Sequence, residues 1–570
     1  MNSSKPPTKP IADLYPLSPM QQGMLFHTLL SPDAGMYLPQ IDLTIEGELD
    51  SIALKQAWQQ VVAQHPVLRT AFQWEKHDQP FQVVYQQVEL PWQEQDWREL
   101  PPDSDRLETF LAADRQQGFD LKTAPLIRLT LIRVADTCYH LIWTQHHLIL
   151  DGWSAGLVLS DVFQAYRHAP LPLRRPYRDY IAWWQQQNQS AAQTFWRTQM
   201  QGFTTPTLLP IGHPSPLTAD PPAPNWTEQH LTLTDTTTAA LKALAQQHQL
   251  TLNTLIQGAF ALLLSRYTDQ DDICFGATHA GRPATLAGAE AMIGLFINTL
   301  PVRVRIAGDV SPILWLQQLQ AQQVEAMQHD CSLLDLQSWC NMPRGTPLFE
   351  SLLVFENYPI DAELFQSDNA LQITQVRSIE WTNVPITLLV SGSNRLLFRL
   401  KFDRHQFQSD AIDRFLTHLQ TLLEGFVLQP NTSLVNLPLL MASELQQLAA
   451  WNTTQTEYPA QCLPDLFEAQ VDRTPDAIAV CFADHQLTYR ELNDRANQLA
   501  HHLQSLGVQP ETVIGICIDR SLDLIIGLLA ILKAGAAYLP LDPTLPPDRL
   551  SFMLTDAQAL LVLTPTPPHP

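Results

Sequence analysis

The chain has 570 residues, of which 45% are hydrophobic and 8% aromatic, and its formal net charge is −23. This length exceeds what one hydrophobic core can organise, so we expect three or four compact globular units. The acidic balance, with no lysine- or arginine-rich patch, argues against binding to nucleic acid or to an anionic membrane surface, and no apolar run reaches the length of a membrane span.

The first residues do not resemble an export signal. Residues 1–13 are polar and proline-rich, without the apolar core of a secretion signal, and we predict that they are disordered. The seven cysteines are scattered, without the spacing of a disulfide framework or a metal motif. These features predict a protein of the reducing cytoplasm.

The next segments alternate between helical and extended patterns. A helix follows the N-terminus and carries Met20 on the same side as a later methionine and a histidine. Residues 51–65 have helical spacing, and residues 66–72 turn into a strand. Arg69 in this turn is either a surface charge or the internal partner of an acid. We also predict a helix and two strands, at residues 106–119, 81–90 and 126–134.

The stretch TCYHLIWTQHHLILDGWS, residues 137–154, carries the strongest chemical pattern. It begins as a buried strand, and Asp151 with Gly152 breaks that strand sharply. A helix follows, for which Ser154 is the predicted cap. Side chains alternate along a strand, so if the strand reaches both histidines, only one of His146 and His147 faces a given cavity.

An imidazole in this setting suits the transfer of a proton from a nucleophile that attacks a carbonyl, because its pKa lies near neutrality. Gly152 offers a backbone N–H that a ligand can approach without a side chain in the way. Two other interpretations stay open from the residues alone. The histidines are packed structural residues, or one of them joins Asp151 in a metal site, although no third ligand stands nearby.

The second half repeats this series of elements. A linker at residues 168–176 leads to an aromatic helix predicted over residues 177–201, and a proline-rich surface connection covers residues 203–226. The further predicted strands are at residues 230–234, 272–283, 292–303, 347–357 and 396–403, and the further helices at residues 237–249, 253–267 and 410–426. Residues 431–460 then form a linker with a short helix, and another domain begins near residue 461.

Several motifs resemble those of one enzyme family. HHLILDG (residues 146–152) matches the HHxxxDG signature of condensation domains of nonribosomal peptide synthetases, which are related to chloramphenicol acetyltransferase. HPVLRT, YRDYIAWW, FGATHAGRP and IGLFINTLPVR resemble further motifs of that family at the expected distances. LTYREL and LKAGAAYLPLDP, near residues 487 and 532, resemble early motifs of adenylation domains.

The resemblance implies an α/β fold, a V-shaped pseudo-dimer of two chloramphenicol acetyltransferase-like lobes with a tunnel between them. The N-terminal lobe is then residues 14–176 and the C-terminal lobe residues 177–430. Residues 461–570 are expected to be only the N-terminal portion of an adenylation domain, inactive by itself because that family's phosphate-binding loop and catalytic lysine are missing.

The resemblance also implies roles for individual residues. His147 contacts the attacking amine, as a base or as a positioning group, and the Gly152 N–H is a candidate oxyanion donor. Asp151 is structural through an arginine, with Arg282 the first choice and Arg69 the second, and His146 packs on the other face. A surface arginine is the alternative for Arg282. The candidate tunnel residues are Trp153, Ser154, Met20 and Asn298.

The implied reaction joins a donor aminoacyl or peptidyl thioester to the α-amine of an acceptor aminoacyl thioester. Both are carried on phosphopantetheine arms of an upstream and a downstream carrier domain, with no metal and no tightly bound cofactor. The segments LSPMQQGMLFH and HHLILDGWS resemble the subtype that accepts a D-configured donor. The protein is expected to be a monomer that works with the rest of the adenylation domain. An epimerisation-type domain or a degenerate domain that only docks carriers is the alternative.

Overall fold

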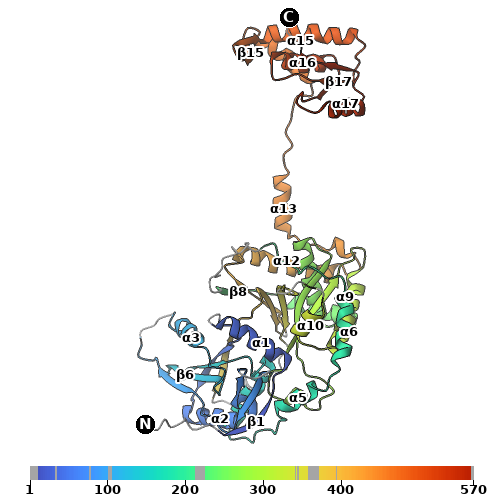
Figure 1. Cartoon of the computed structure of the whole chain (residues 1–570). Helices are drawn as coiled ribbons and strands as arrows, with labels where there is room; N and C mark the ends of the chain where they lie inside the picture. The colour runs from blue at the N-terminus through green and yellow to red at the C-terminus, as the bar shows by residue number, and fades with distance from the viewer. Residues whose placement is uncertain are drawn as a thin grey trace, which may run out of the picture. The chain divides into compact units, whose positions relative to one another are not determined.

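The computed structural model describes residues 10–32, 35–75, 79–100, 105–211, 225–340, 342, 346–356, 371–392 and 394–565. The chain divides into two compact units, Met1–Leu448 and Ala449–Pro570 (Figure 1). Within the described residues no helix is both long enough and apolar enough to cross a bilayer.

The first half of the larger unit is built on a five-stranded sheet of order β12-β2-β7-β6-β5. Its pairs are antiparallel except β5 with β6. The strands are β2 (Gln40–Gly47), β5 (Trp92–Asp96), β6 (Ile127–Ala135), β7 (Cys138–Gln145) and β12 (Leu371–Ile379). A small antiparallel sheet consists of β1 (Ile11–Pro16), β4 (Phe81–Tyr85) and β3 (Thr70–Gln73).

Four helices beside these strands, α1, α2, α4 and α5, contribute to one core, and Leu111 of α3 lies in a separate small cluster with Ile132 and Ile142. α2 and α4 pack against each other, and each begins at an aspartate that accepts backbone N–H groups, Asp50 and Asp151 respectively. The helices are α1 (Pro19–Leu30), α2 (Ser51–Gln64), α3 (Arg106–Gln116), α4 (Gly152–Tyr166) and α5 (Tyr177–Trp184), and a 3₁₀ turn covers Pro66–Arg69.

The second half has a six-stranded sheet of order β10-β9-β11-β13-β14-β8. β11 pairs in parallel with β9 and β13, and the other pairs are antiparallel. The strands are β8 (Trp226–Thr232), β9 (Asp272–His279), β10 (Asn298–Arg305), β11 (Ser351–Phe355), β13 (Ile386–Ser391) and β14 (Leu397–Asp403).

α8 and α12 pack on each other and share a core with the six-stranded sheet. Twelve of the seventeen residues of α8 are buried, as expected for a helix that is apolar on most of its surface. The helices are α6 (Gln189–Gln199), α7 (Asp235–Gln247), α8 (Leu252–Thr268), α9 (Pro312–Gln328), α10 (Leu333–Trp339), α12 (Ser409–Leu428) and α13 (Ala442–Trp451).

The smaller unit contains a two-stranded antiparallel sheet, β15-β16, and a parallel sheet of order β18-β17-β19. Its elements are α14 (Leu463–Arg473), β15 (Ile478–Phe482), β16 (His485–Thr488), α15 (Tyr489–Ser505), β17 (Val513–Ile516), α16 (Leu522–Lys533), β18 (Ala537–Pro540), α17 (Pro547–Asp556) and β19 (Leu561–Leu563). The unit is mixed α/β, as predicted.

The structure corrects several sequence-based boundaries. Residues 1–9 of the predicted disordered segment lie outside the described residues, but Ile11–Asp13 are part of β1. The helix predicted over residues 177–201 is interrupted after Trp184 and begins again as α6, where Asn188 caps it. The strand predicted over residues 292–303 begins only at Asn298.

The predicted division between the lobes at residues 176 and 177 is crossed by one strand. β12, from the second half of the sequence, pairs along its length with β2 at the edge of the first sheet. Its successor β13 belongs to the second sheet. The segment between β12 and β13 therefore runs from one sheet to the other.

Candidate active site

The two adjacent histidines lie in the turn that joins β7 to α4. β7 ends at Gln145, one residue before the first histidine. The backbone N–H of His146 donates to the carbonyl of Leu126 at 3.0 Å, and that of His147 donates to the carbonyl of Tyr37 at 2.9 Å. The N–H groups of the two histidines thus bond to segments on opposite sides, as those of successive residues in a strand do, although β7 itself has ended.

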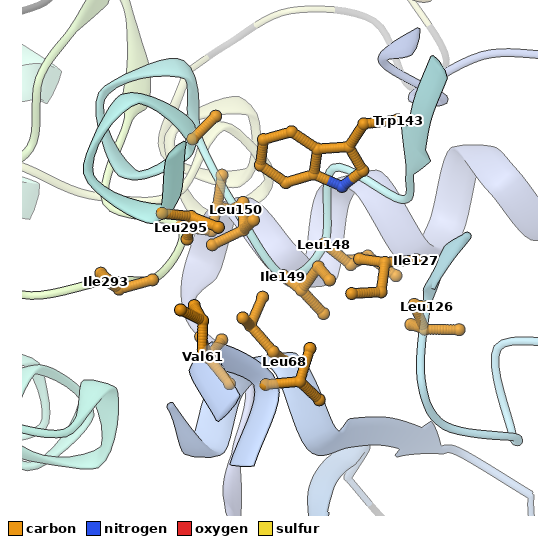
Figure 2. Close-up of a cluster of buried hydrophobic side chains, with 14 of the residues drawn as sticks. Val61, Leu68, Leu126, Ile127, Trp143, Leu148, Ile149, Leu150, Ile293 and Leu295 are labelled. Carbon is orange, nitrogen blue, oxygen red and sulfur yellow. The ribbon is translucent and has the colours of Figure 1, made fainter. Parts of the chain in front are cut away.

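The three residues after His147 anchor this turn in the core. Leu148, Ile149 and Leu150 are each fully buried. Figure 2 shows them among Val61 and Leu68 of the first half and Ile293 and Leu295 of the second. Burial of an aliphatic side chain of this size contributes about 1.5–3 kcal/mol. The position of the histidines is therefore fixed by apolar packing immediately beside them.

Asp151 ties the end of the turn to α4 and to the second half of the chain. Its Oδ1 accepts the Ser154 N–H at 2.7 Å and its Oδ2 accepts the Phe296 N–H at 2.8 Å. Arg282 Nη2 lies 3.4 Å from Oδ1, and the carboxylate is fully buried. The Asp151 carboxylate therefore connects the start of α4 to the segment that contains Arg282 and Phe296.

Ser154 has a different position from the one predicted. Asp151, not Ser154, caps α4, because a side chain at the N-cap reaches the N–H group three residues on. The Ser154 hydroxyl donates to the Gly294 carbonyl at 2.7 Å and accepts from the Gly294 N–H at 3.0 Å and from Arg282 Nη2 at 2.8 Å. Ser154 is fully buried and, among the described residues, is not one that lines the cavity.

Arg282 and Arg69 are both buried, but only Arg282 lies beside Asp151. Arg282 also donates to the carbonyls of Ala289 and Met292, at 2.6 and 2.9 Å, and burial lowers the pKa of its guanidinium although the charge of Asp151 opposes this. Arg69 instead donates to backbone carbonyls within the first half, including that of Gln86 at 2.9 Å.

Two glycines allow the second half to approach this turn closely. Gly281 has φ +58°, and a Cβ there would lie 1.7 Å from the carbonyl oxygen of Phe296. A Cβ on Gly294 would lie 2.1 Å from the ring of Tyr177, whose hydroxyl donates to the Leu295 carbonyl at 2.5 Å. The backbone can therefore pass close to α5 and present its N–H groups to Asp151.

A large cavity opens at the histidine turn. Its volume is about 2220 Å³, and its walls come from both halves of the larger unit. The lining residues include His147, Gly152, Trp153, Met20 and Asn298, all predicted for the site or its tunnel. His146 does not belong to the described part of this lining.

The polar candidates on this wall differ in their bonding. Asn298 Nδ2 donates to the Cys331 carbonyl at 2.8 Å and to Asp330, while Trp153 Nε1 donates to the Glu290 carbonyl at 3.0 Å. The Gly152 N–H is the first of α4, and no hydrogen bond is recorded from it to another described residue. The first N–H groups of a helix lack partners within the helix and carry partial positive charge, so Gly152 suits a developing oxyanion.

His147 has a charged partner that the sequence did not suggest. Its Nε2 lies 3.0 Å from Oε1 of Glu380, just beyond β12. Burial lowers the pKa of His147, but the charge and hydrogen bond of Glu380 outweigh burial and raise the pKa to about 8. Burial, the largest single influence, raises the pKa of Glu380, but the charge and hydrogen bond of His147 together with the charges of Lys401 and Arg399 outweigh it and lower the pKa to about 2. The pair is an imidazolium and a carboxylate at neutral pH.

His146 is held in the opposite protonation state. Its Nδ1 accepts the Leu148 N–H at 3.2 Å, which leaves the proton of the neutral ring on Nε2. Burial, with a smaller contribution from the charge of His147, lowers the pKa of His146 to about 3. Two adjacent histidines therefore differ by their surroundings, and only His147 carries charge near pH 7.

Glu380 escaped prediction because nothing local distinguishes it. It follows an exposed, mostly polar strand, and its partner is more than two hundred residues earlier. Only the sheet topology, in which β12 pairs with β2 of the first sheet, places Glu380 close to His147. In the described part of the chain no group of three His, Cys, Asp or Glu side chains is arranged to hold a metal ion.

Comparison with known families agrees with this geometry. The family described as "Condensation domain" matches residues 11–449, and the family described as "AMP-binding enzyme" matches residues 467–570. One linear gramicidin synthase protein of Brevibacillus parabrevis is 44% identical over 97% of this chain, and Tyrocidine synthase 2 of the same organism is 34% identical over 97%. The chain spans only 7% and 16% of those proteins.

Solved structures share the fold at low sequence identity. The AMPPNP-bound nonribosomal peptide synthetase FmoA3 is 22% identical with a TM-score of 0.79, covering 99% of this chain and 59% of that one. The starter condensation domain of rhizomide synthetase RzmA is 18% identical with a TM-score of 0.63, covering 75% of this chain and 98% of that one. These matches confirm the predicted fold class, two chloramphenicol acetyltransferase-like lobes followed by a partial adenylation region. The chain belongs to the condensation domain family of nonribosomal peptide synthetases.

Proposed function

We propose that the larger unit forms an amide bond between a donor acyl thioester and the α-amine of an acceptor aminoacyl thioester. The observation that carries this proposal is the position of His147, an imidazole on the wall of a cavity of about 2220 Å³ lined by both halves. Sites for one drug-sized molecule are typically 300–1,000 Å³, so this cavity has room for two tethered substrates.

His147 is the group that meets the acceptor's amine. General acid–base help of this kind contributes about 10²–10⁴-fold to a rate, and positioning of the amine contributes further. The raised pKa means that the free enzyme carries a protonated imidazole at neutral pH. His147 therefore acts as a base only after it has lost that proton, and otherwise holds the amine through hydrogen bonds.

Gly152 supplies the complementary group, an N–H directed at the oxygen of the tetrahedral intermediate. The support is its place at the start of α4 on the cavity wall. Asp151 and Arg282 have structural roles, because their hydrogen bonds connect the turn to the rest of the fold, and His146 has a structural role as a buried residue that bonds within the turn. Arg69 has a structural role elsewhere in the first half.

The substrates are borne by partner domains. An upstream carrier presents the donor and a downstream carrier presents the acceptor, each on a phosphopantetheine arm, and the donor residue is D-configured. The protein acts as a monomeric part of a cytoplasmic synthetase that includes the rest of the adenylation domain. No metal takes part in the proposed chemistry.

A single-turnover assay with both carriers loaded tests this function. One donor carrier bears an L-aminoacyl residue and another its D-isomer, and the product is identified on the acceptor carrier by mass. We expect the amide product from the D-donor in the wild-type protein. Epimerised donor without amide, or no change in either carrier, would contradict the proposal and support the epimerisation or docking alternative.

A further inference from the structure

One nitrogen of His147 is paired with a carboxylate in this structure, and the other is buried. Nε2 is occupied by Oε1 of Glu380 at 3.0 Å, and Nδ1 is buried without a hydrogen-bond partner among the described residues. An acceptor amine can reach Nε2 only by sharing or replacing the contact with Glu380. Binding of the acceptor amine at Nε2 therefore changes the contact between His147 and Glu380.

The backbone around Glu380 is held firmly. Its own carbonyl accepts from Lys401 Nζ at 2.8 Å, and the carbonyl of Trp381 accepts the Tyr37 N–H at 3.0 Å. The Tyr37 hydroxyl also donates to Asn383 at 2.7 Å. These contacts fix where the side chain starts, and they come from both halves of the unit.

The carboxylate of Glu380 is held less completely than its backbone. Within the described ranges, its one hydrogen-bond partner is His147, whereas a carboxylate has about four acceptor positions. Its side chain is 24% exposed, and it lines the cavity. Glu380 therefore has both the capacity and the access to receive a second cationic donor.

The other cations near Glu380 have partners of their own. The charged and titratable groups that act on His147 or Glu380, or on which they act, are Lys401, Arg399, Asp151, His146 and Tyr37, and Glu228 and Glu356 act on Lys401. Arg399 is paired with Glu356 at 2.7 Å, and Lys401 binds a carbonyl. The cation that the acceptor always brings is its α-ammonium group, because α-amino groups titrate near pH 8.

We propose that Glu380 binds the α-ammonium group of the acceptor, which takes the place of the His147 imidazole at the carboxylate and leaves Nε2 free beside the amine. This inference rests on the function proposed above for His147. Glu380 is then a substrate-binding residue, and it selects an acceptor by its charge.

Each proton that moves in this exchange has a defined acceptor. On binding, the imidazolium of His147 loses its counter-charge and releases one proton to solvent. Neutral Nε2 then removes one proton from the ammonium, and the nitrogen lone pair attacks the donor carbonyl. The second proton lost by the nitrogen goes to the departing thiolate as the C–S bond breaks. The imidazolium is restored and pairs with Glu380 again.

Two acceptor analogues that differ only in charge test the proposal with the whole chain. Alanyl-pantetheine amide carries the α-ammonium, and propionyl-pantetheine amide lacks it. We expect the wild-type protein to be inhibited about 10- to 100-fold more strongly by the alanyl analogue, the range for one charge-assisted hydrogen bond. In Glu380→Gln this preference should disappear, and Glu380→Asp should retain part of it.

Glu228→Gln is the matched control, because it removes another carboxylate of the same cavity. It should keep the wild-type preference. Equal inhibition of the wild-type protein by both analogues, or an unchanged preference in Glu380→Gln, would overturn the proposal.

A measurement on the unmodified protein covers the case in which Glu380→Gln fails to fold. Calorimetric titration at pH 7 in two buffers of different ionisation enthalpy reports proton release. The alanyl analogue should release close to one proton and the propionyl analogue none, and equal release would overturn the proposal.

In His147→Ala the preference for the alanyl analogue should persist. A His147→Ala protein that still condenses would therefore refute the proposed function without deciding the role of Glu380.

Discussion

Two strand–turn–helix units of the larger unit resemble each other locally but differ in their polar groups. The first runs from β7 through the histidine turn to α4, and the second from β14 through residues 404–408 to α12. At the end of β14, where the second turn begins, the buried Asp403 accepts the Asn225 and His405 N–H groups at 2.9 and 3.1 Å, and His405 is exposed.

The first turn is buried throughout, whereas most of residues 404–408 are exposed or half-buried, and the first turn leaves polar atoms without partners. His146 Nε2 and His147 Nδ1 are buried and unbonded among the described residues, and the Gly152 N–H has no recorded acceptor there. Unpaired buried polar groups cost stability, so they persist where they have another use. The difference supports the proposal that the first turn takes part in chemistry, whereas the polar groups of the second turn bond to the surrounding backbone.

The largest expected effect comes from removing the imidazole. His147→Ala should lower the steady-state rate of condensation by about 10³–10⁴-fold, because the amine loses its proton-transfer or positioning partner. The variant should stay folded, since the turn is anchored by its apolar neighbours, but near neutral pH it should lose the roughly 2 kcal/mol that the pairing with Glu380 contributes to stability. A variant that keeps more than a tenth of the wild-type rate would contradict the role of His147.

Asp151→Ala should destabilise the larger unit by about 3–5 kcal/mol, because it leaves Arg282 buried without its counter-charge. Denaturant unfolding and the yield of soluble protein measure this effect, and activity should fall with the folded fraction.

Asp403→Ala sharpens the comparison, because it removes a buried carboxylate from the start of the second turn. It should cost stability but leave the activity of the folded protein unchanged.

Gly152→Pro tests the proposed oxyanion donor. Proline is tolerated at the first position of a helix, and the residue before it, Asp151, already has an extended backbone with ψ 173°. The variant should fold and lose about 10²–10³-fold in rate, the usual effect of one lost oxyanion donor. Gly152→Ala keeps the N–H group and serves as control, so equal losses in both variants would contradict this role.

The smallest effect concerns pH. The folded-state pKa of His147 is raised from 6.5 to about 8, so its pairing with Glu380 stabilises the fold fully below pH 6.5 and this contribution is lost as the pH rises through 8. The loss is about 2 kcal/mol for a shift of this size. Unfolding of the wild type and of Glu380→Gln at pH 6 and pH 9 measures it. A difference between the two proteins that is the same at both pH values would contradict the pairing.

The sequence allowed the histidine turn to be predicted because its signals are local. An apolar strand, an Asp-Gly break and a helical pattern follow one another directly within residues 137–166. The cap of α4 was misassigned because both Asp151 and Ser154 are good capping residues, and only the geometry shows which one accepts. Glu380 was missed because its place depends on a strand that crosses between sheets, which no periodicity reveals.

The most direct test of the account is a single-turnover comparison of the two turns. Matched His147→Ala and His405→Ala proteins are mixed with a loaded donor carrier and a loaded acceptor carrier, and amide product is followed with time. We predict that His405→Ala matches the wild-type rate and that His147→Ala forms almost no product. Comparable rates in both variants would contradict the claim that the first turn performs the chemistry.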